Sequence, residues 1–185
     1  MSQAPEMRDY RAEDGLACHA LRRRAFLDDF SQSLPQDAVQ AGADSYGVSE
    51  FAKRIGAMGT FVATVEDVVA GFCSIRLLSP TRAEVLYLYV DSEHRRSGIG
   101  ARLARHAEQR VSSAHPELET LFLDTAIPEY NQAFWERIGY QLVGPSSCDY
   151  PTGRIPAVRL EKRVDRQGSA SAKASYGGLW SWTKD

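Results

Sequence analysis

The chain has 185 residues, a formal net charge of −2 and a pI of about 6.1. Since 43% of the residues are hydrophobic and 25% are charged, the composition is typical of a soluble globular protein. No overall positive charge points to nucleic acid, and no apolar run approaches the ~18 residues of a membrane-spanning helix. We therefore expect a cytoplasmic protein that binds neither nucleic acid nor a membrane.

The three cysteines, Cys18, Cys73 and Cys148, are far apart in the sequence. No two of them have the C-x-x-C spacing and no histidine pair lies nearby, so the pattern fits neither a zinc site nor a disulfide framework. The sequence predicts a protein without bound metal in a reducing compartment.

The first third of the chain predicts a strand followed by helices. Residues 6–10 favour a short strand, and residues 11–26 carry leucines and alanines near helical spacing. Residues 31–59 include Pro35 and four glycines. We expect only one or two short helices there, one of them at 48–58.

A hairpin, a strand and a helix come next. Two stretches rich in β-branched and aromatic residues, at 60–67 and 68–79, are joined by a polar turn and predict the hairpin. Residues 83–91, with the sequence AEVLYLYVD, predict another strand. The helix that follows Gly98 carries an apolar stripe at a spacing of four residues. Its members are Ile99, Leu103, Ala107 and Val111.

The last third predicts a strand at 119–126, a helix at 128–139 and two strands at 140–144 and 155–164. The whole order is a strand, a helical segment, three strands, a helix, a strand, a helix and two strands. It indicates one mixed α/β domain over residues 1–165, with a strand–helix–strand crossover at its centre.

The composition changes after residue 165. Residues 166–185 begin with small polar residues and end near Trp180 and Trp182, which is typical of a flexible tail. Exposed tryptophans are unfavourable unless something covers them. They would pack on the protein's own sheet, on the second subunit of a homodimer or on another partner, or remain uncovered.

Residues 91–100 place two arginines and two glycines between a predicted strand and a helix N-terminus. Free amides of the first helical turn, the helix dipole and glycines that allow close backbone approach together predict an anion site. The P-loop pattern fails because no Lys-Ser or Lys-Thr follows the glycines. The dinucleotide pattern fails because Leu103 replaces its third glycine or alanine, and because residues 91–97 intervene.

Arg95, Gly98 and Gly100 fit the pattern [R/Q]-x-x-G-x-[G/A] between a strand and an amphipathic helix. In this position the pattern resembles the acyl-CoA-binding motif of the GNAT superfamily of N-acyltransferases. A later stretch resembles a second motif of the family, a helix with an asparagine, an aromatic residue and a terminal Gly-aromatic pair. Its matching residues are Asn131, Trp135, Gly139 and Tyr140.

The resemblance covers residues 8–164 and implies the GNAT-like fold. This fold has a central mixed sheet of six or seven strands, flanked by helices and splayed at the acyl-CoA site. It also implies acetyl-CoA as cosubstrate, without a metal. The pyrophosphate is expected on the backbone amides of residues 96–101, and the pantetheine arm beside the backbone of Leu88 and Val90.

Asn131 would bind the pantetheine or the diphosphate region, unless it only starts its helix. The residues that the resemblance assigns to cofactor binding are Leu88, Tyr89, Val90, Arg95, Arg96, Ser97, Gly98, Ile99, Gly100, Ala101, Asn131 and Trp135.

The implied activity is direct transfer of an acetyl group to a primary amine. A neutral amine attacks the thioester carbonyl, a backbone amide near Leu88 stabilises the oxyanion, and a base takes the proton of the amine. Glu84 is the candidate base, because histone acetyltransferases of the family carry their glutamate in a similar AEI sequence. Burial would raise the pKa of such a carboxylate. Alternatively, Glu84 lies at an exposed strand start or pairs with Arg76 or Arg82.

The general acid stays open at this point. The later helix of the family often carries a tyrosine that protonates the departing thiolate, and Trp135, whose indole is no useful acid, occupies that place. The proton would come from Tyr140, Tyr130, another tyrosine or water, and we carry Tyr140 forward as the candidate. Tyr87 and Tyr89 share one strand face and line either the core or the substrate site.

The amine acceptor carries no recognisable motif. In the family it is shaped by the segment at 26–58 and by the loop at 146–154. The first segment is acidic, which would attract a cationic amine, although acids on a loop are more often simply solvated. A small amine, a peptide N-terminus and a lysine side chain are the acceptors in question. The acidic residues of the segment at 26–58 are Asp28, Asp29, Asp37 and Asp44.

The alternatives to an enzyme are a catalytically silent acyl-CoA sensor and an interaction protein.

Overall fold

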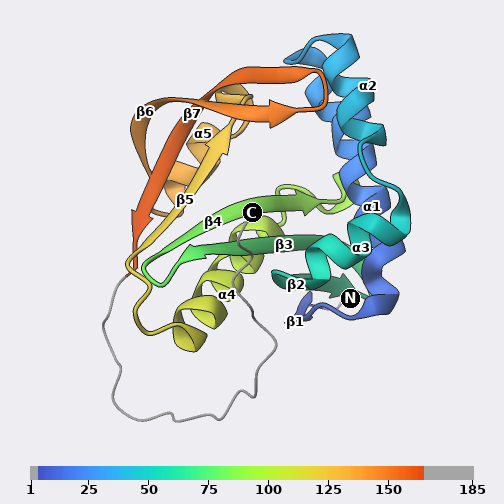
Figure 1. Ribbon diagram of the computed structural model, residues 1–185. Helices are drawn as coiled ribbons and strands as arrows, with labels where there is room; N and C mark the ends of the chain where they lie inside the picture. Colours follow the sequence, from blue (N-terminus) through green and yellow to red (C-terminus); the bar gives the residue numbers. More distant parts are fainter. Residues whose placement is uncertain (1–3, 165–185) are drawn as a thin grey trace.

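Seven strands form one mixed sheet in the computed structural model, which describes residues 4–164 (Figure 1). The strands are β1 (Glu6–Asp9), β2 (Gly59–Val65), β3 (Val68–Ser79), β4 (Arg82–Val90), β5 (Thr120–Thr125), β6 (Gln141–Tyr150) and β7 (Gly153–Arg163). The helices are α1 (Gly15–Arg24), α2 (Gln36–Asp44), α3 (Val48–Gly56), α4 (Ile99–Ala114) and α5 (Pro128–Arg137). The predicted order of elements and the mixed α/β fold are confirmed. The predicted tail, with Trp180 and Trp182, lies outside the described residues.

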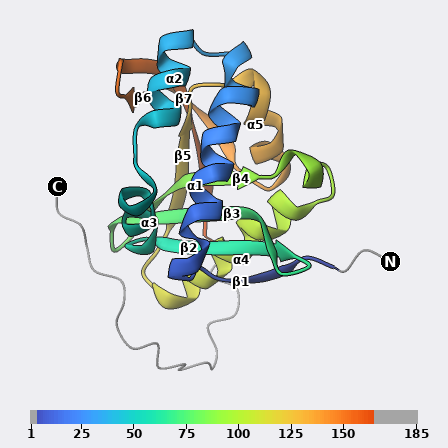
Figure 2. The same ribbon diagram turned by 90° about the vertical axis from the view of Figure 1, so that its right-hand side faces the viewer.

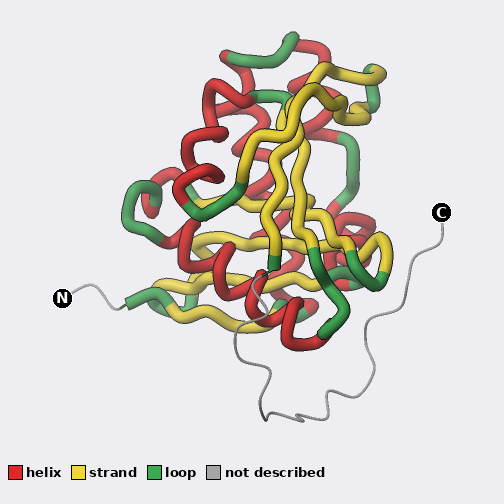
Figure 3. Tube along the Cα trace, turned by 90° about the vertical axis from the view of Figure 1, so that its left-hand side faces the viewer, coloured by secondary structure: helices red, strands yellow, loops and turns green. Residues whose placement is uncertain are grey.

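The sheet divides into two parts that meet at its centre. Its strand order is β1-β2-β3-β4-β5-β7-β6, and only β4 and β5 run parallel. The parallel ladder has three residue pairs, from Arg82↔Thr120 to Glu84↔Phe122. Beyond them β5–β7 rise away from β1–β4, as the views from two sides show (Figures 1 and 3). The sheet is therefore splayed on one side of the β4–β5 pair.

Helices cover both faces of the β1–β4 part. Helix α4 packs on β2 and β3, while α1 and α3 lie on the opposite face, where α1 crosses in front of the strands (Figure 2). The four apolar residues of the predicted α4 stripe are all buried. They join β-strand side chains such as Cys73 and Ile75 in the larger core cluster. A second cluster, around Phe51 and Phe72, fills the space under α1 and α3.

The structure corrects two predicted boundaries. The predicted loop at 146–154 is mostly strand, because β6 pairs with β7 as far as Tyr150↔Gly153 and a register shift at Gly144 absorbs the irregularity there. The predicted helix at 11–26 is divided, because a 3-10 turn precedes α1 and a π-helical turn, Ala25–Asp29, follows it. Within residues 4–164 no helix is both long enough and apolar enough to cross a membrane.

Candidate active site

The opening in the sheet begins at Glu84, where the β4–β5 ladder ends. From there β4 continues to Val90 with β3 as its pairing partner. The Asp91 N–H donates to the Ala70 carbonyl of β3 at 2.8 Å, so the Val90 carbonyl of the same peptide unit points away from β3. Because backbone groups alternate along a strand, those of Leu88 share this direction. β4 therefore directs main-chain donors and acceptors into the opening.

A cavity of about 640 Å³ lies at this opening. Its wall consists of the end of β4, the loop at 91–98, the first turns of α4, helix α5 and the segment after α1. The volume is within the usual range of small-molecule sites. Ten of the twelve residues assigned to cofactor binding line the cavity. They are Leu88, Tyr89, Val90, Arg95, Arg96, Gly98, Gly100, Ala101, Asn131 and Trp135.

The loop at 91–98 turns sharply before α4 begins. Arg96 has a φ of 58° and Gly98 a φ of 84°, both in the left-handed region that favours glycine. The Arg102 N–H donates to the Gly98 carbonyl at 3.1 Å, so the earlier amides of this turn lack helical partners. A Cβ on Gly98 would meet no atom within 4 Å, and one on Gly100 would make only ordinary van der Waals contacts. The space beside these amides therefore fits an anion such as a pyrophosphate.

Two of the assigned residues do not line the cavity. Ser97 is exposed, and its Oγ donates to the His94 carbonyl at 2.5 Å. Ile99 is 3% exposed and points into the core. Their contribution to an anion site is limited to their backbone amides.

Three arginines at the cavity are available for an anion. Arg96, Arg105 and Arg137 are exposed, and none has an ion-pair partner among the described residues. Guanidinium groups form strong charge-assisted hydrogen bonds with phosphate oxygens. The position of Arg96 agrees with the sequence analysis, whereas Arg105 and Arg137 belong to no recognised motif.

Helix α5 supplies the opposite wall. Asn131 lines the cavity, and its Oδ1 is buried without a hydrogen-bond partner among residues 4–164. A buried amide oxygen without a donor is unfavourable, so an amide N–H of a ligand would complete it. Trp135 is 6% exposed and packs edge-on against Phe134 and Tyr140, with ring centroids 5.1 and 5.2 Å away. Trp135 therefore lines the cavity as a tightly packed, nearly buried side chain.

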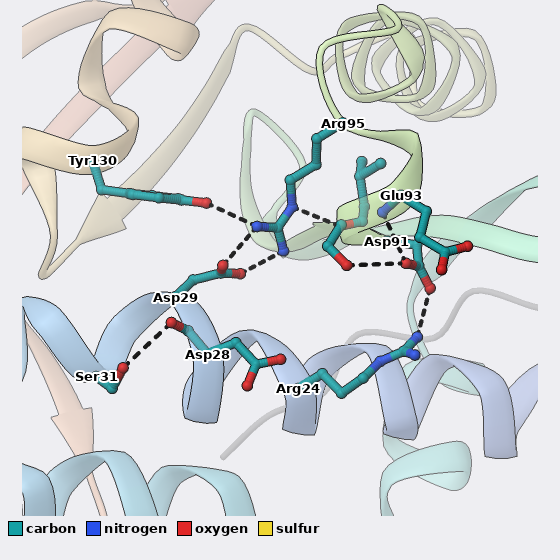
Figure 4. Close-up of polar contacts among 10 residues, drawn as sticks. Arg24, Asp28, Asp29, Ser31, Asp91, Glu93, Arg95 and Tyr130 are labelled. Atoms are coloured by element: carbon teal, nitrogen blue, oxygen red, sulfur yellow. Dashed lines mark hydrogen bonds and ion pairs between the residues drawn. The ribbon is translucent and has the colours of Figure 1, made fainter.

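Arg95 is held by other residues of the protein (Figure 4). Its Nη1 and Nη2 donate to the two carboxylate oxygens of Asp29 at 2.6 and 2.5 Å, and its Nε donates to the Val90 carbonyl at 3.2 Å. Donation to the Asp29 carboxylate raises the pKa of Arg95 above its ordinary value. The Arg95 guanidinium is therefore occupied within the protein, whereas the resemblance assigns Arg95 to cofactor binding.

Comparison with protein-family models matches residues 18–140 to the acetyltransferase (GNAT) family. The chain belongs to the GNAT acetyltransferase family. A sequence comparison with curated proteins found no match.

Solved structures with the GNAT fold are similar to this chain. A GCN5-related N-acetyltransferase from Rhodopseudomonas palustris has a TM-score of 0.75 at 19% identity, covering 89% of this chain and 98% of that one. PaiA N-acetyltransferase from Thermoplasma acidophilum, solved with coenzyme A, has a TM-score of 0.72 at 16% identity, covering 88% and 100%. The ribosomal-protein-S18-alanine N-acetyltransferase from Escherichia coli has a TM-score of 0.65 at 18% identity, covering 91% and 99%. At these identities the likeness establishes the fold.

GNAT acetyltransferases use acetyl-CoA. The residues of this chain fit such a molecule, because free amides, unpaired arginines and the Asn131 oxygen surround one cavity. Residues 4–164 contain no group of three or more His, Cys, Asp or Glu side chains that could hold a metal ion.

The candidate base of this GNAT domain, Glu84, lies at the vertex of the opening. Its neighbours Ala83 and Val85 face the core under α4, so its own side chain faces the side of α1 and α3. Its Oε2 accepts from Arg76 Nη2 at 2.6 Å, and the side chain is 13% exposed. The pairing alternative of the sequence analysis is therefore present for Arg76. Glu84 does not itself line the described cavity.

The other catalytic candidate, Tyr140, lies inside the core of the GNAT domain. It is 2% exposed, and its hydroxyl donates to Glu108 Oε1 at 2.9 Å. Lys162 Nζ donates to the other oxygen of Glu108 at 2.6 Å. Burial and the adjacent Glu108 raise the pKa of Tyr140 well above its ordinary value. This placement disagrees with a role in protonating a thiolate, because the hydroxyl is enclosed and already donates elsewhere.

Sequence reasoning missed part of the GNAT cavity wall. Ala25, Asp29 and Phe30 line it from the segment after α1. In the sequence, Asp29 stands out only as one of several acids that would attract a cationic amine. No local pattern identifies its partner, because Arg95 lies 66 residues further along the chain.

Proposed function

We propose that this GNAT protein is an N-acetyltransferase that transfers the acetyl group of acetyl-CoA to a primary amine by direct attack. One observation carries the proposal: the unpaired edge of β4 leads directly into a cavity that ends at the turn of Gly98 and the N-terminus of α4. An extended arm with amide groups and an anionic end fits these two neighbouring features.

In this proposal the binding residues act mainly through the main chain. Leu88 and Val90 would pair with the pantetheine amides, and the amides of residues 96–101 would hold the pyrophosphate. Asn131 would accept from an amide N–H. Arg96 and the other unpaired arginines would draw the phosphates towards the loop by their positive charge.

The reacting part would lie near a bulge in β4. Ser74 pairs with Tyr87 and Ile75 pairs with Val85, so Leu86 has no partner in the β3–β4 ladder. A bulge redirects backbone groups locally, and we assign the amides from Leu86 to Leu88 to the carbonyl oxygen on which negative charge develops.

Glu84 stands two residues before this bulge on the face towards α1 and α3. We propose that it takes the proton of the attacking amine, directly or through water. Arg76 occupies Oε2, whereas Oε1 has no hydrogen bond from the described residues and is the oxygen available for this step. The proton for the departing thiolate would come from water or from a phenol other than Tyr140.

The proposal specifies the acceptor as a primary amine and does not specify its size. The structure gives less support than the sequence to the idea that acidic residues attract a cationic amine. Asp29 is paired with Arg95 and Asp44 with Arg23, so their charges are balanced within the protein. A small amine, a peptide N-terminus and a lysine side chain are therefore tested together.

The test is thiol release from acetyl-CoA in the presence of a panel of amines, with binding of acetyl-CoA measured in parallel. We expect turnover with at least one amine class. Replacing Glu84 by Gln should lower turnover by roughly 10²–10⁴ with unchanged acetyl-CoA affinity, and the loss should shrink at high pH, where the amine deprotonates unaided. Binding without turnover across the panel would favour the acyl-CoA sensor, and absence of binding would refute the proposal.

A further inference from the structure

Two ion pairs join the end of α1 and the turn that follows it to the loop that precedes α4 (Figure 4). Arg24 Nη2 lies 2.6 Å from Asp91 Oδ2, and Asp29 accepts from both terminal nitrogens of Arg95. We call residues 24–29 the clamp segment and residues 91–98 the glycine loop. The clamp segment therefore contacts the start and the middle of the glycine loop.

Four of the five N–H donors of Arg95 have partners within the protein, and two of these four belong to the second pair. A guanidinium has five N–H groups. Two donate to Asp29, one to the Val90 carbonyl and one, at a longer 3.4 Å, to the Tyr130 hydroxyl. The side chains of Arg95 and Asp29 are 33% and 13% exposed, so the pair is partly shielded from water. In this arrangement Arg95 ties the loop to the end of β4 and to the clamp segment.

The two pairs have opposite polarity. In the first pair the clamp segment provides the cation, Arg24, and in the second it provides the anion, Asp29. Exchanging the partners would bring Arg24 to Arg95 and Asp29 to Asp91, and like charges repel. Opposite polarity therefore fixes which part of the clamp segment contacts which part of the glycine loop.

We propose that Asp29 is a positioning residue for coenzyme binding, which acts by holding Arg95. The bidentate pair keeps the glycine loop in the conformation in which the amides at the start of α4 face the cavity. Asp29 also lines that cavity, so the same residue forms part of the wall and holds the loop. The inference rests on the proposed function in that the ligand of the loop is the coenzyme.

A different role for Arg95 makes the opposite prediction for Asp29. If Arg95 were a direct phosphate ligand, Asp29 would compete for its guanidinium, and removal of Asp29 would leave coenzyme affinity unchanged or increase it. If Asp29 positions the loop, its removal weakens binding, because the coenzyme must then order the loop itself. The sign of the change separates the two roles.

The first experiment needs no coenzyme. Amide hydrogen exchange of residues 91–101 is compared between the parent chain, Asp29→Asn and the control Asp28→Asn. Asp28 is exposed and one residue away, and its carboxylate has no partner among the described residues, so the control matches the change in charge (Figure 4). We expect faster exchange of the loop only in Asp29→Asn. Equal exchange in all three proteins would overturn the proposal.

The second experiment measures the Kd of coenzyme A by calorimetry in a double-mutant cycle of Asp29→Ala, Arg95→Ala and the double variant. We expect each single variant to bind about tenfold more weakly, the usual scale for a hydrogen bond to a charged group, and the double variant to bind no worse than either. Additive losses, or tighter binding by Asp29→Ala, would overturn the proposal. If the parent chain itself binds no coenzyme A, the proposed function fails, and this result is distinct from a parent that binds equally well without Asp29.

Discussion

Replacing Tyr140 by Phe separates a structural role of this residue from a catalytic one. The variant keeps the ring that packs edge-on against Trp135 and removes only the hydroxyl that donates to Glu108 at 2.9 Å. Buried hydrogen bonds to charged groups stabilise proteins by about 1.5–3 kcal/mol. Lys162 still contacts Glu108 in the variant, so we expect a loss of about 2 kcal/mol in the free energy of unfolding.

Urea denaturation and a thermal scan measure this loss, which corresponds to a decrease of about 4–8 °C in Tm for a chain of this size. Turnover below the transition should stay within about threefold of the parent, or ~0.7 kcal/mol of barrier, because the hydroxyl lies outside the cavity. Tyr130→Phe is the stability control, since that phenol is 51% exposed. A stable variant with turnover reduced by more than about a hundredfold would show that Tyr140 is the acid after all.

Two further predictions concern Gly100 in the first turn of α4 and the dependence of stability on pH. Gly100→Val should weaken acetyl-CoA binding at least about tenfold, ~1.4 kcal/mol, because its γ-methyl groups extend beyond a Cβ position that already lies 3.5 Å from Val90 and 3.6 Å from Phe134 in the cavity wall. The single Cβ of Gly100→Ala makes only ordinary contacts and should cost less. Calorimetry gives both Kd values. A folded Gly100→Val variant with the affinity of the parent would show that the anion does not bind at this turn. Burial, followed by the charge of Arg110, lowers the pKa of His106 below its ordinary value of 6.5. The unfolded chain therefore binds a proton at this histidine more readily than the folded chain does. Neutral His106 thus contributes to stability above pH 6.5, and this contribution is lost as the pH falls. Denaturation at pH 7.5 and pH 5 measures how much the free energy of unfolding decreases between the two pH values. This decrease should be smaller for His106→Gln than for the parent, and equal decreases would contradict the role of His106.

The sheet and its flanking helices could be predicted because their signals are local. β-branched and aromatic residues marked β2, β3 and β4, and the four-residue spacing of apolar side chains marked α4. The anion site at the end of the glycine loop could also be predicted, because Gly98 and Gly100 are only two residues apart in the sequence. On the proposed binding mode, most of the residues assigned to the coenzyme act through the backbone, and the position of this backbone follows from these elements.

Contacts between distant segments could not be predicted. Tyr140 follows Gly139 shortly after the end of α5, and this local pattern reveals nothing about its hydrogen-bond partner. The partner is Glu108, which lies 32 residues earlier and accepts from the Tyr140 hydroxyl. The partner of Arg95 is equally hidden, because an acid on an irregular segment is more often solvated than paired. The extension of β6 was missed for a similar reason, since pairing with β7 outweighs the local preference of Gly144 and Pro145 for a turn.

A sheet that opens between β4 and β5 affects how freely the sequence can diverge. Recognition through the main chain uses the N–H donor and the C=O acceptor, and every residue except proline has both. If the coenzyme pairs with this edge as proposed, a change of side chain at Leu88 or Val90 leaves the hydrogen-bonding pattern of the strand in place. Such tolerance agrees with solved structures that share this fold at only 16–19% identity. On the proposed binding mode, the substitutions that harm this edge are proline and residues that close the gap between the two strands.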